Sequence, residues 1–192
     1  MSGKTSRTKG CVNEREVAGM LESWWQGVEP GCSFVRTPSS GGWSTPKVRA
    51  EFRASGDVMT TAKRFPFGVE VKRREGFVWS TVVAGKASPV WSWWMQTGKA
   101  ALEQLESVPM LWMRRNGERW RVMLPERVLE RLIGGEGLMQ ARFVVARGIR
   151  VPVAAFAYPE MPVGIVSAQS LLAVHPVLLL QKLTEVRRDT CE

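Results

Sequence analysis

The order of helix-like and strand-like segments constrains the fold of this 192-residue chain most strongly. Apolar residues recur at helical spacing over residues 13–27 and again over 89–105, and each stretch predicts an amphipathic helix. Short segments with the alternation of strands lie between and after these helices, at 32–37, 57–60, 67–72, 109–114 and 119–124. The last two flank Asn116-Gly117, a strong hairpin signal. Helices interleaved with strands predict an α/β fold.

The first residues of the chain are read as an arm followed by a helix start. Residues 1–9 are polar and basic without apolar periodicity, which predicts a flexible arm able to touch phosphates or simply a frayed terminus. Asn13 followed by Glu16 has the pattern of an N-cap with its reciprocal acid. Residues 43–56 are expected to form a long connector.

The pattern changes after Pro125. We expect a short helix at 126–133, strands at 138–146 and 149–157, and an apolar helical segment over 167–186 that Pro176 interrupts or restarts. We therefore divide the chain into a core of residues 1–125 and a C-terminal α+β extension of residues 126–192. The leucines between Leu171 and Leu183 supply a wide apolar arc, which we expect to build or shield a dimer; the alternative is a helix that caps its own sheet.

Net charge points to a polyanionic partner. The formal net charge is +9 and the sequence pI is about 10.1. Residues 1–125 hold 19 basic and 11 acidic side chains, whereas residues 126–192 hold 8 and 7. A surplus of this size serves either nucleic-acid binding or solubility alone, and in the first case the binding surface should lie before residue 126.

Several classes of protein are excluded by what the sequence lacks. No apolar run is long enough to span a bilayer and the N-terminus lacks the apolar stretch of a signal peptide, so we expect a cytoplasmic protein that does not bind membranes. Cys11, Cys32 and Cys191 form no CxxC pair and His175 is the only histidine, which argues against zinc sites, a disulfide framework and a histidine-based triad. The loop at Gly41-Gly42 lacks P-loop spacing, so no nucleotide cofactor is expected. Carboxylates, lysine and serine remain, and hydrolysis by carboxylates usually requires a hard cation such as Mg²⁺.

Four residues form a candidate cation site with an ammonium group beside it. Glu14 belongs to the apolar stripe of the first helix and needs a partner there, or else is a first-turn acid stabilised by the helix N-terminus. Asp57 begins one predicted strand, and Glu70 and Lys72 share one face of the next, about 7 Å apart along it. The alternative for the last two is an ordinary solvated salt bridge.

The ordered set of these residues resembles the PD-(D/E)XK nuclease superfamily, and more closely its archaeal-type Holliday junction resolvases, some of which occur in phages. The resemblance spans roughly residues 7–124 and rests on Lys9-Gly10, Glu14-Arg15-Glu16, Arg36 with Ser40, Ser55-Gly56-Asp57 and Glu70-Val71-Lys72. It implies a restriction-endonuclease-like fold, with a central mixed sheet flanked by helices. Two departures are the long connector between Ser40 and Asp57 and the absence of any match in residues 126–192.

The resemblance also implies roles for individual residues. Metal-binding and catalytic carboxylates would be Glu14, Asp57 and Glu70, with Lys72 as the catalytic lysine and Ser40 as a loop serine near the scissile phosphate. DNA contacts would come from Lys9, Arg15, Arg36 and Gln96.

These observations lead to one expected function and two alternatives. We expect a homodimeric Mg²⁺-dependent endonuclease, with Mn²⁺ able to substitute, that resolves four-way DNA junctions. The alternatives are a repair or restriction-type nuclease that cuts duplex or flapped DNA, and a noncatalytic basic DNA-binding module.

Overall fold

The fold is taken from a computed structural model that describes residues 3–38, 52–103, 107–133 and 163–189. For residues 3–9, 54–55, 102–103, 131–133 and 184–189 it describes the backbone alone. Within these ranges, no helix has both the length and the apolar character needed to cross a membrane.

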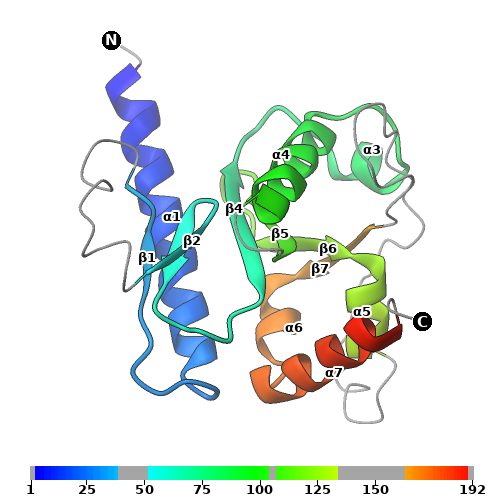
Figure 1. The fold of residues 1–192 in the computed structure, drawn as a ribbon. Coiled ribbons are helices and arrows are strands. Elements are labelled where there is room, and N and C mark those ends of the chain that lie inside the picture. The colour runs from blue at the N-terminus through cyan, green and yellow to red at the C-terminus, as the bar shows by residue number, and fades with distance from the viewer. Residues whose placement is uncertain (1–2, 39–51, 104–106, 134–162, 190–192) are drawn as a thin grey trace.

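A mixed four-stranded sheet lies at the centre of the molecule (Figure 1). Its strand order is β4-β5-β6-β7. Strands β4 (Phe67–Arg73) and β5 (Val108–Arg114) are parallel, whereas β5 pairs antiparallel with β6 (Arg121–Pro125) and β6 pairs antiparallel with β7 (Val163–Ser167). The predicted hairpin around Asn116-Gly117 is confirmed, with Gly117 at φ +73°.

Helices cover both faces of this sheet. Helix α1 (Gly3–Trp25) packs on one face together with α5 (Glu126–Ile133), α6 (Ala168–Leu172) and α7 (Pro176–Asp189). Helices α3 (Trp79–Val83) and α4 (Pro89–Glu103) cover the other face (Figure 1). Alternate side chains of each strand enter the two cores, since Val69 and Val71 face α1 while Leu111 and Met113 face α4. The predicted α/β class with a mixed sheet flanked by helices is therefore confirmed.

A small antiparallel sheet lies beside the free edge of β4. It has the order β1-β3-β2, formed by β1 (Phe34–Arg36), β2 (Arg53–Ser55) and β3 (Val58–Thr60). Strand β2 lies in the segment that we expected to be a connector. A single bridge from Gly56 to Val69 joins this small sheet to β4.

Two expectations for the N-terminal region are wrong. Helix α1 begins at Gly3, so most of the expected flexible arm is helical. Asn13 lies inside this helix and is no N-cap, because its side chain is 3% exposed and accepts a hydrogen bond from Arg114 Nη2 at 2.8 Å. Glu16, expected as its reciprocal acid, instead accepts a bond from the same guanidinium at 2.6 Å.

The C-terminal region completes the core of its own chain. Strand β7 was not predicted, and it forms the edge of the central sheet, so strands from both sides of residue 125 belong to one sheet. Leu171, Leu179 and Leu183 are buried in the core that includes α1, as the alternative of a self-capping helix predicts, whereas Leu172, Leu178 and Leu180 are only partly buried. That the segment builds or shields a dimer stays a prediction. Pro176 begins α7, as its position predicted. The strands expected at 138–146 and 149–157 lie outside the described residues.

Candidate active site

Asp57 is fixed by two hydrogen bonds to the edge of β4 and by a third to the residue that follows β1. Its backbone N–H donates to Val69 O at 2.7 Å, and its Oδ2 accepts the N–H of Val71 at 2.8 Å. Its carbonyl accepts the N–H of Thr37 at 2.9 Å. Two of these bonds fix the backbone of Asp57, and the bond from Val71 orients its carboxylate.

Gly56 makes this close approach between the two sheets feasible. Its φ of +82° lies in the left-handed region, which residues with a Cβ rarely adopt. A Cβ at this position would lie 2.9 Å from the carbonyl carbon of Val69 and closer still to its oxygen. The position of Asp57 therefore depends on a glycine immediately before it.

Glu70 and Lys72 lie on the face of β4 that α4 covers. Glu70 is only 4% exposed, its carboxylate forms an ion pair with the Lys72 ammonium, and Gln96 Nε2 on α4 donates to Glu70 Oε1 at 3.2 Å. Burial raises the pKa of Glu70, and the nearby Asp57 charge raises it further, while Lys72 opposes both. A fully solvated surface salt bridge does not fit this geometry, because the Glu70 side chain is 5% exposed and that of Lys72 is 17% exposed, on the side that faces the pocket.

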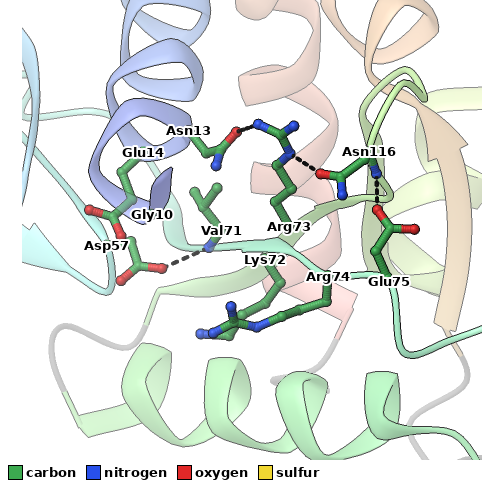
Figure 2. Close-up of a pocket in the computed structure, with 10 residues that line it drawn as sticks. All are labelled: Gly10, Asn13, Glu14, Asp57, Val71, Lys72, Arg73, Arg74, Glu75 and Asn116. Carbon is green, nitrogen blue, oxygen red and sulfur yellow. Dashed lines mark hydrogen bonds between the residues drawn. The ribbon is translucent and has the colours of Figure 1, made fainter. Parts of the chain in front are cut away.

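Glu14 reaches the same place from α1, on the opposite face of the sheet. Its Oε2 accepts a hydrogen bond from Arg36 Nε at 2.6 Å. Burial raises the pKa of Glu14, Asp57 adds to the rise, and Arg36 opposes it. Figure 2 shows the carboxylates of Glu14 and Asp57 pointing toward each other beside β4. Three carboxylates from three elements thus lie within electrostatic reach of one another.

A pocket of about 290 Å³ opens next to these carboxylates (Figure 2). It runs from Glu14 and Asp57 along the C-terminal end of β4 to the hairpin. Its lining residues are Gly10, Asn13, Glu14, Asp57, Val71, Lys72, Arg73, Arg74, Glu75 and Asn116. Glu14 and Asp57 thus lie at one end of the pocket, and Arg73 lies toward the hairpin at the other end, where Glu75 is bonded to the Asn116 backbone; a cation and a phosphate could be held side by side.

The donor set fits a hard divalent cation in its chemistry. Oxygen donors alone are offered, which is what Mg²⁺ prefers. As they stand, no three His, Cys, Asp or Glu side chains of the described ranges are grouped closely enough to hold a metal ion. Glu14 and Glu70 instead neutralise Arg36 and Lys72, so binding a cation would require these two carboxylates to exchange partners.

Of the other residues that the sequence suggested, two contact the site and the others do not or are not described. Gln96 contacts Glu70 and Arg36 contacts Glu14, so both reach the site through a carboxylate. Arg15 is exposed on α1. Lys9 lies on the same helix, but its side chain is outside the described part, and Ser40 lies outside the described residues altogether. Their expected DNA contacts stay predictions.

Sequence reasoning missed the arginine end of the pocket. Arg73 and Arg74 directly follow the Glu70-Val71-Lys72 motif, and this proximity was the available signal. Asn116 was interpreted only as a turn residue and Asn13 only as a cap, although both side chains line the pocket.

Comparisons with known proteins identify the family. A family model described as "Phage putative PDDEXK endonuclease" matches residues 5–154. No curated protein matches the chain. Among solved structures, Hjc, a Holliday junction resolvase from the archaeal hyperthermophile Archaeoglobus fulgidus, is similar at 12% sequence identity and a TM-score of 0.32, over 88% of this chain and 93% of that chain. Because the family model covers most of the chain, including the helix and strands that carry Glu14, Asp57, Glu70 and Lys72, this protein belongs to the phage PD-(D/E)XK endonuclease family.

Proposed function

We propose that this protein is a Mg²⁺-dependent, structure-selective endonuclease that resolves four-way DNA junctions by hydrolysis of phosphodiester bonds. The observation that carries the proposal is the meeting of Glu14, Asp57 and the Glu70–Lys72 pair at one edge of β4. Membership of an endonuclease family supports the hydrolytic reaction. The ordered motifs that resemble junction resolvases support the four-way substrate.

The carboxylates would hold the cation. Asp57 and Glu70, with Glu14 from α1, are the oxygen donors near the pocket. When bound, Mg²⁺ supplies Lewis acidity that offsets the charge on the scissile phosphate and activates the attacking water. Asp57 would enter this role without rearrangement, because backbone hydrogen bonds already fix its position.

Lys72 would act on the phosphate itself. Lys72 lines the pocket and its ammonium is paired with Glu70. With Glu70 holding a metal ion, this ammonium would be available to a phosphate oxygen. A positive charge at that position favours the transition state more than the ground state, since negative charge increases as the attacking oxygen approaches. Gln96 would keep the Glu70 side chain oriented meanwhile.

We also propose that the working form is a homodimer. A four-way junction is cut in pairs related by a two-fold axis, and two copies of this site in a C₂ dimer supply that symmetry. The basic surplus of residues 1–125 would provide the DNA-facing surface.

Cleavage of a synthetic four-way junction tests the proposal. With Mg²⁺ the protein should cut the junction in paired positions in preference to duplex DNA of the same sequence, and with EDTA it should not. Asp57→Asn and Glu70→Gln should abolish cutting and leave junction binding intact, whereas Glu130→Gln on the exposed face of α5 should behave like the parent. Equal cutting of duplex and junction would refute the junction preference. Retained cutting by Asp57→Asn would refute the assigned site.

A further inference from the structure

Arg73 is an oriented cation at the end of the pocket away from Glu14 and Asp57. Its Nε donates to Asn116 Oδ1 at 2.7 Å and its Nη1 lies 3.5 Å from Asn13 Oδ1. Figure 2 shows the guanidinium held between these two amides, above the strand that carries Lys72. The side chain is partly exposed and lines the pocket.

Both groups that orient Arg73 are themselves held in place. Asn13 is 3% exposed and also accepts from Arg114 Nη2 at 2.8 Å. The backbone N–H of Asn116 donates to Glu75 Oε1 at 2.5 Å. The guanidinium is therefore ordered before any ligand arrives, so binding an anion there costs little side-chain entropy.

The hydrogen-bond partners of Arg73 are neutral. By contrast, Arg36 and Arg114 form ion pairs with Glu14 and Glu16, and Arg115 lies 3.5 Å from Glu75. Within the described part of the chain, Arg73 has only neutral amide oxygens as partners. These two bonds use two of its five N–H donors, and three remain for a ligand. An ordered guanidinium with full charge and spare donors suits a phosphate.

The register of β4 places this cation relative to the cleavage site. Asp57 is bonded to the backbone of Val71, and Arg73 follows two residues later, about 7 Å along the strand. A DNA strand rises about 3.4 Å per nucleotide, so this span matches about two nucleotides. We infer that Arg73 is a positioning residue that binds a backbone phosphate one or two nucleotides from the scissile phosphate. This inference rests on the proposed DNA cleavage.

The salt dependence of binding provides the first test. In the cleavage-deficient Glu70→Gln protein, Arg73→Gln should weaken junction binding about five- to tenfold and lower the slope of log Kd against log salt by about one unit. Arg127→Gln removes the same charge from an exposed position on α5 and should change neither quantity. An unchanged slope for Arg73→Gln overturns the inference. A Glu70→Gln parent that binds no DNA overturns the proposed function, and the inference with it.

A second variant separates phosphate binding from a purely structural role. Asn116→Asp keeps the size of the side chain and the preference for the hairpin turn but gives Arg73 a carboxylate partner. A phosphate-binding role predicts weaker DNA binding with an unchanged unfolding midpoint. A purely structural role predicts unchanged or tighter DNA binding, and that result overturns the inference.

Chemically modified DNA locates the phosphate. One methylphosphonate, which removes a single backbone charge, is placed at successive positions around the cut site. At one position within two nucleotides of the cut site, the methylphosphonate should weaken DNA binding by the parent but not by Arg73→Gln. The reason is that the methylphosphonate and the substitution remove the same contact. Additive losses at every position would show that Arg73 contacts none of these phosphates.

Discussion

Replacing Gly56 with alanine tests whether the backbone at the edge of β4 positions Asp57 for the proposed catalytic role. A Cβ at this position would lie 2.9 Å from the carbonyl carbon of Val69, which is backbone and cannot rotate away. The φ of +82° adds a cost of about 1–2 kcal/mol for an L-residue. If the segment moves to relieve the contact, the bonds from Asp57 N to Val69 O and from Val71 N to Asp57 Oδ2 are lost, at about 1 kcal/mol each.

We therefore expect Gly56→Ala to lower the free energy of unfolding by about 3–4 kcal/mol. A displacement of Asp57 by about 1 Å should slow cleavage about 100-fold. Urea denaturation and single-turnover cleavage with saturating Mg²⁺ measure the two effects. Gly19→Ala is the control, because it lies on the exposed side of α1 with nothing within 4 Å of a Cβ, and it should stabilise the helix by about 0.5–1 kcal/mol. Cleavage by Gly56→Ala at the parent rate would refute the reasoning.

Three further predictions concern charge and burial. The pKa of Glu70 is raised in the folded protein above its value of about 4.5 in the unfolded chain. Protonated Glu70 therefore stabilises the metal-free fold at pH values below the unfolded pKa, and this stabilisation is lost as the pH rises through the folded pKa. At pH 8 and without metal, Glu70→Gln should therefore have a higher free energy of unfolding than the parent in urea denaturation, by about 1.4 kcal/mol for each unit that the pKa is raised. The difference should disappear at pH 4. An equal difference at both pH values would contradict this prediction. Added Mg²⁺ should raise the thermal midpoint of the parent but not of Asp57→Asn, as scanning calorimetry would show, and equal shifts would show that the ion binds elsewhere. Leu179→Glu places a charge in the core, so circular dichroism should show an unfolded chain, and a folded monomer in light scattering would instead put Leu179 at a subunit interface.

The main helices and the strand hairpin that precede Glu126 could be predicted because their sequence signals are local. Helical apolar spacing and the Asn116-Gly117 turn located α1, α4 and the β5–β6 hairpin. Strand β7 was missed because Val163–Ser167 is a short apolar run buried on both faces, and such a run has no alternation to distinguish it from a helix segment. The start of α1 was misplaced because Asn13 has the chemistry of a cap, while its actual partners, Arg73 and Arg114, are brought near it only by the fold.

The residues of the candidate site could be predicted from the sequence, but their burial and their contacts with distant elements could not. Spacing put Glu70 and Lys72 on one face of a strand, and the structure agrees. Their burial depends on α4, which lies across that face, and no local pattern shows which face a distant helix covers. The role of Gly56 was equally hidden, since it arises from contact with the backbone of Val69 in another sheet.

The three acidic groups reach the edge of β4 from three separate layers: Glu14 from α1, Glu70 from the face under α4, and Asp57 from the small sheet. Under the proposed function, a chain in which α1 or the small sheet has not docked would lack Glu14 or Asp57 at this edge. A chain in which α4 has not docked would keep Glu70 on β4 but without the Gln96 contact. Cleavage at such a site would depend on complete folding, so a nascent or partly melted chain would not nick DNA. On heating, activity should disappear with whichever layer detaches first, ahead of the loss of helical signal from the whole molecule.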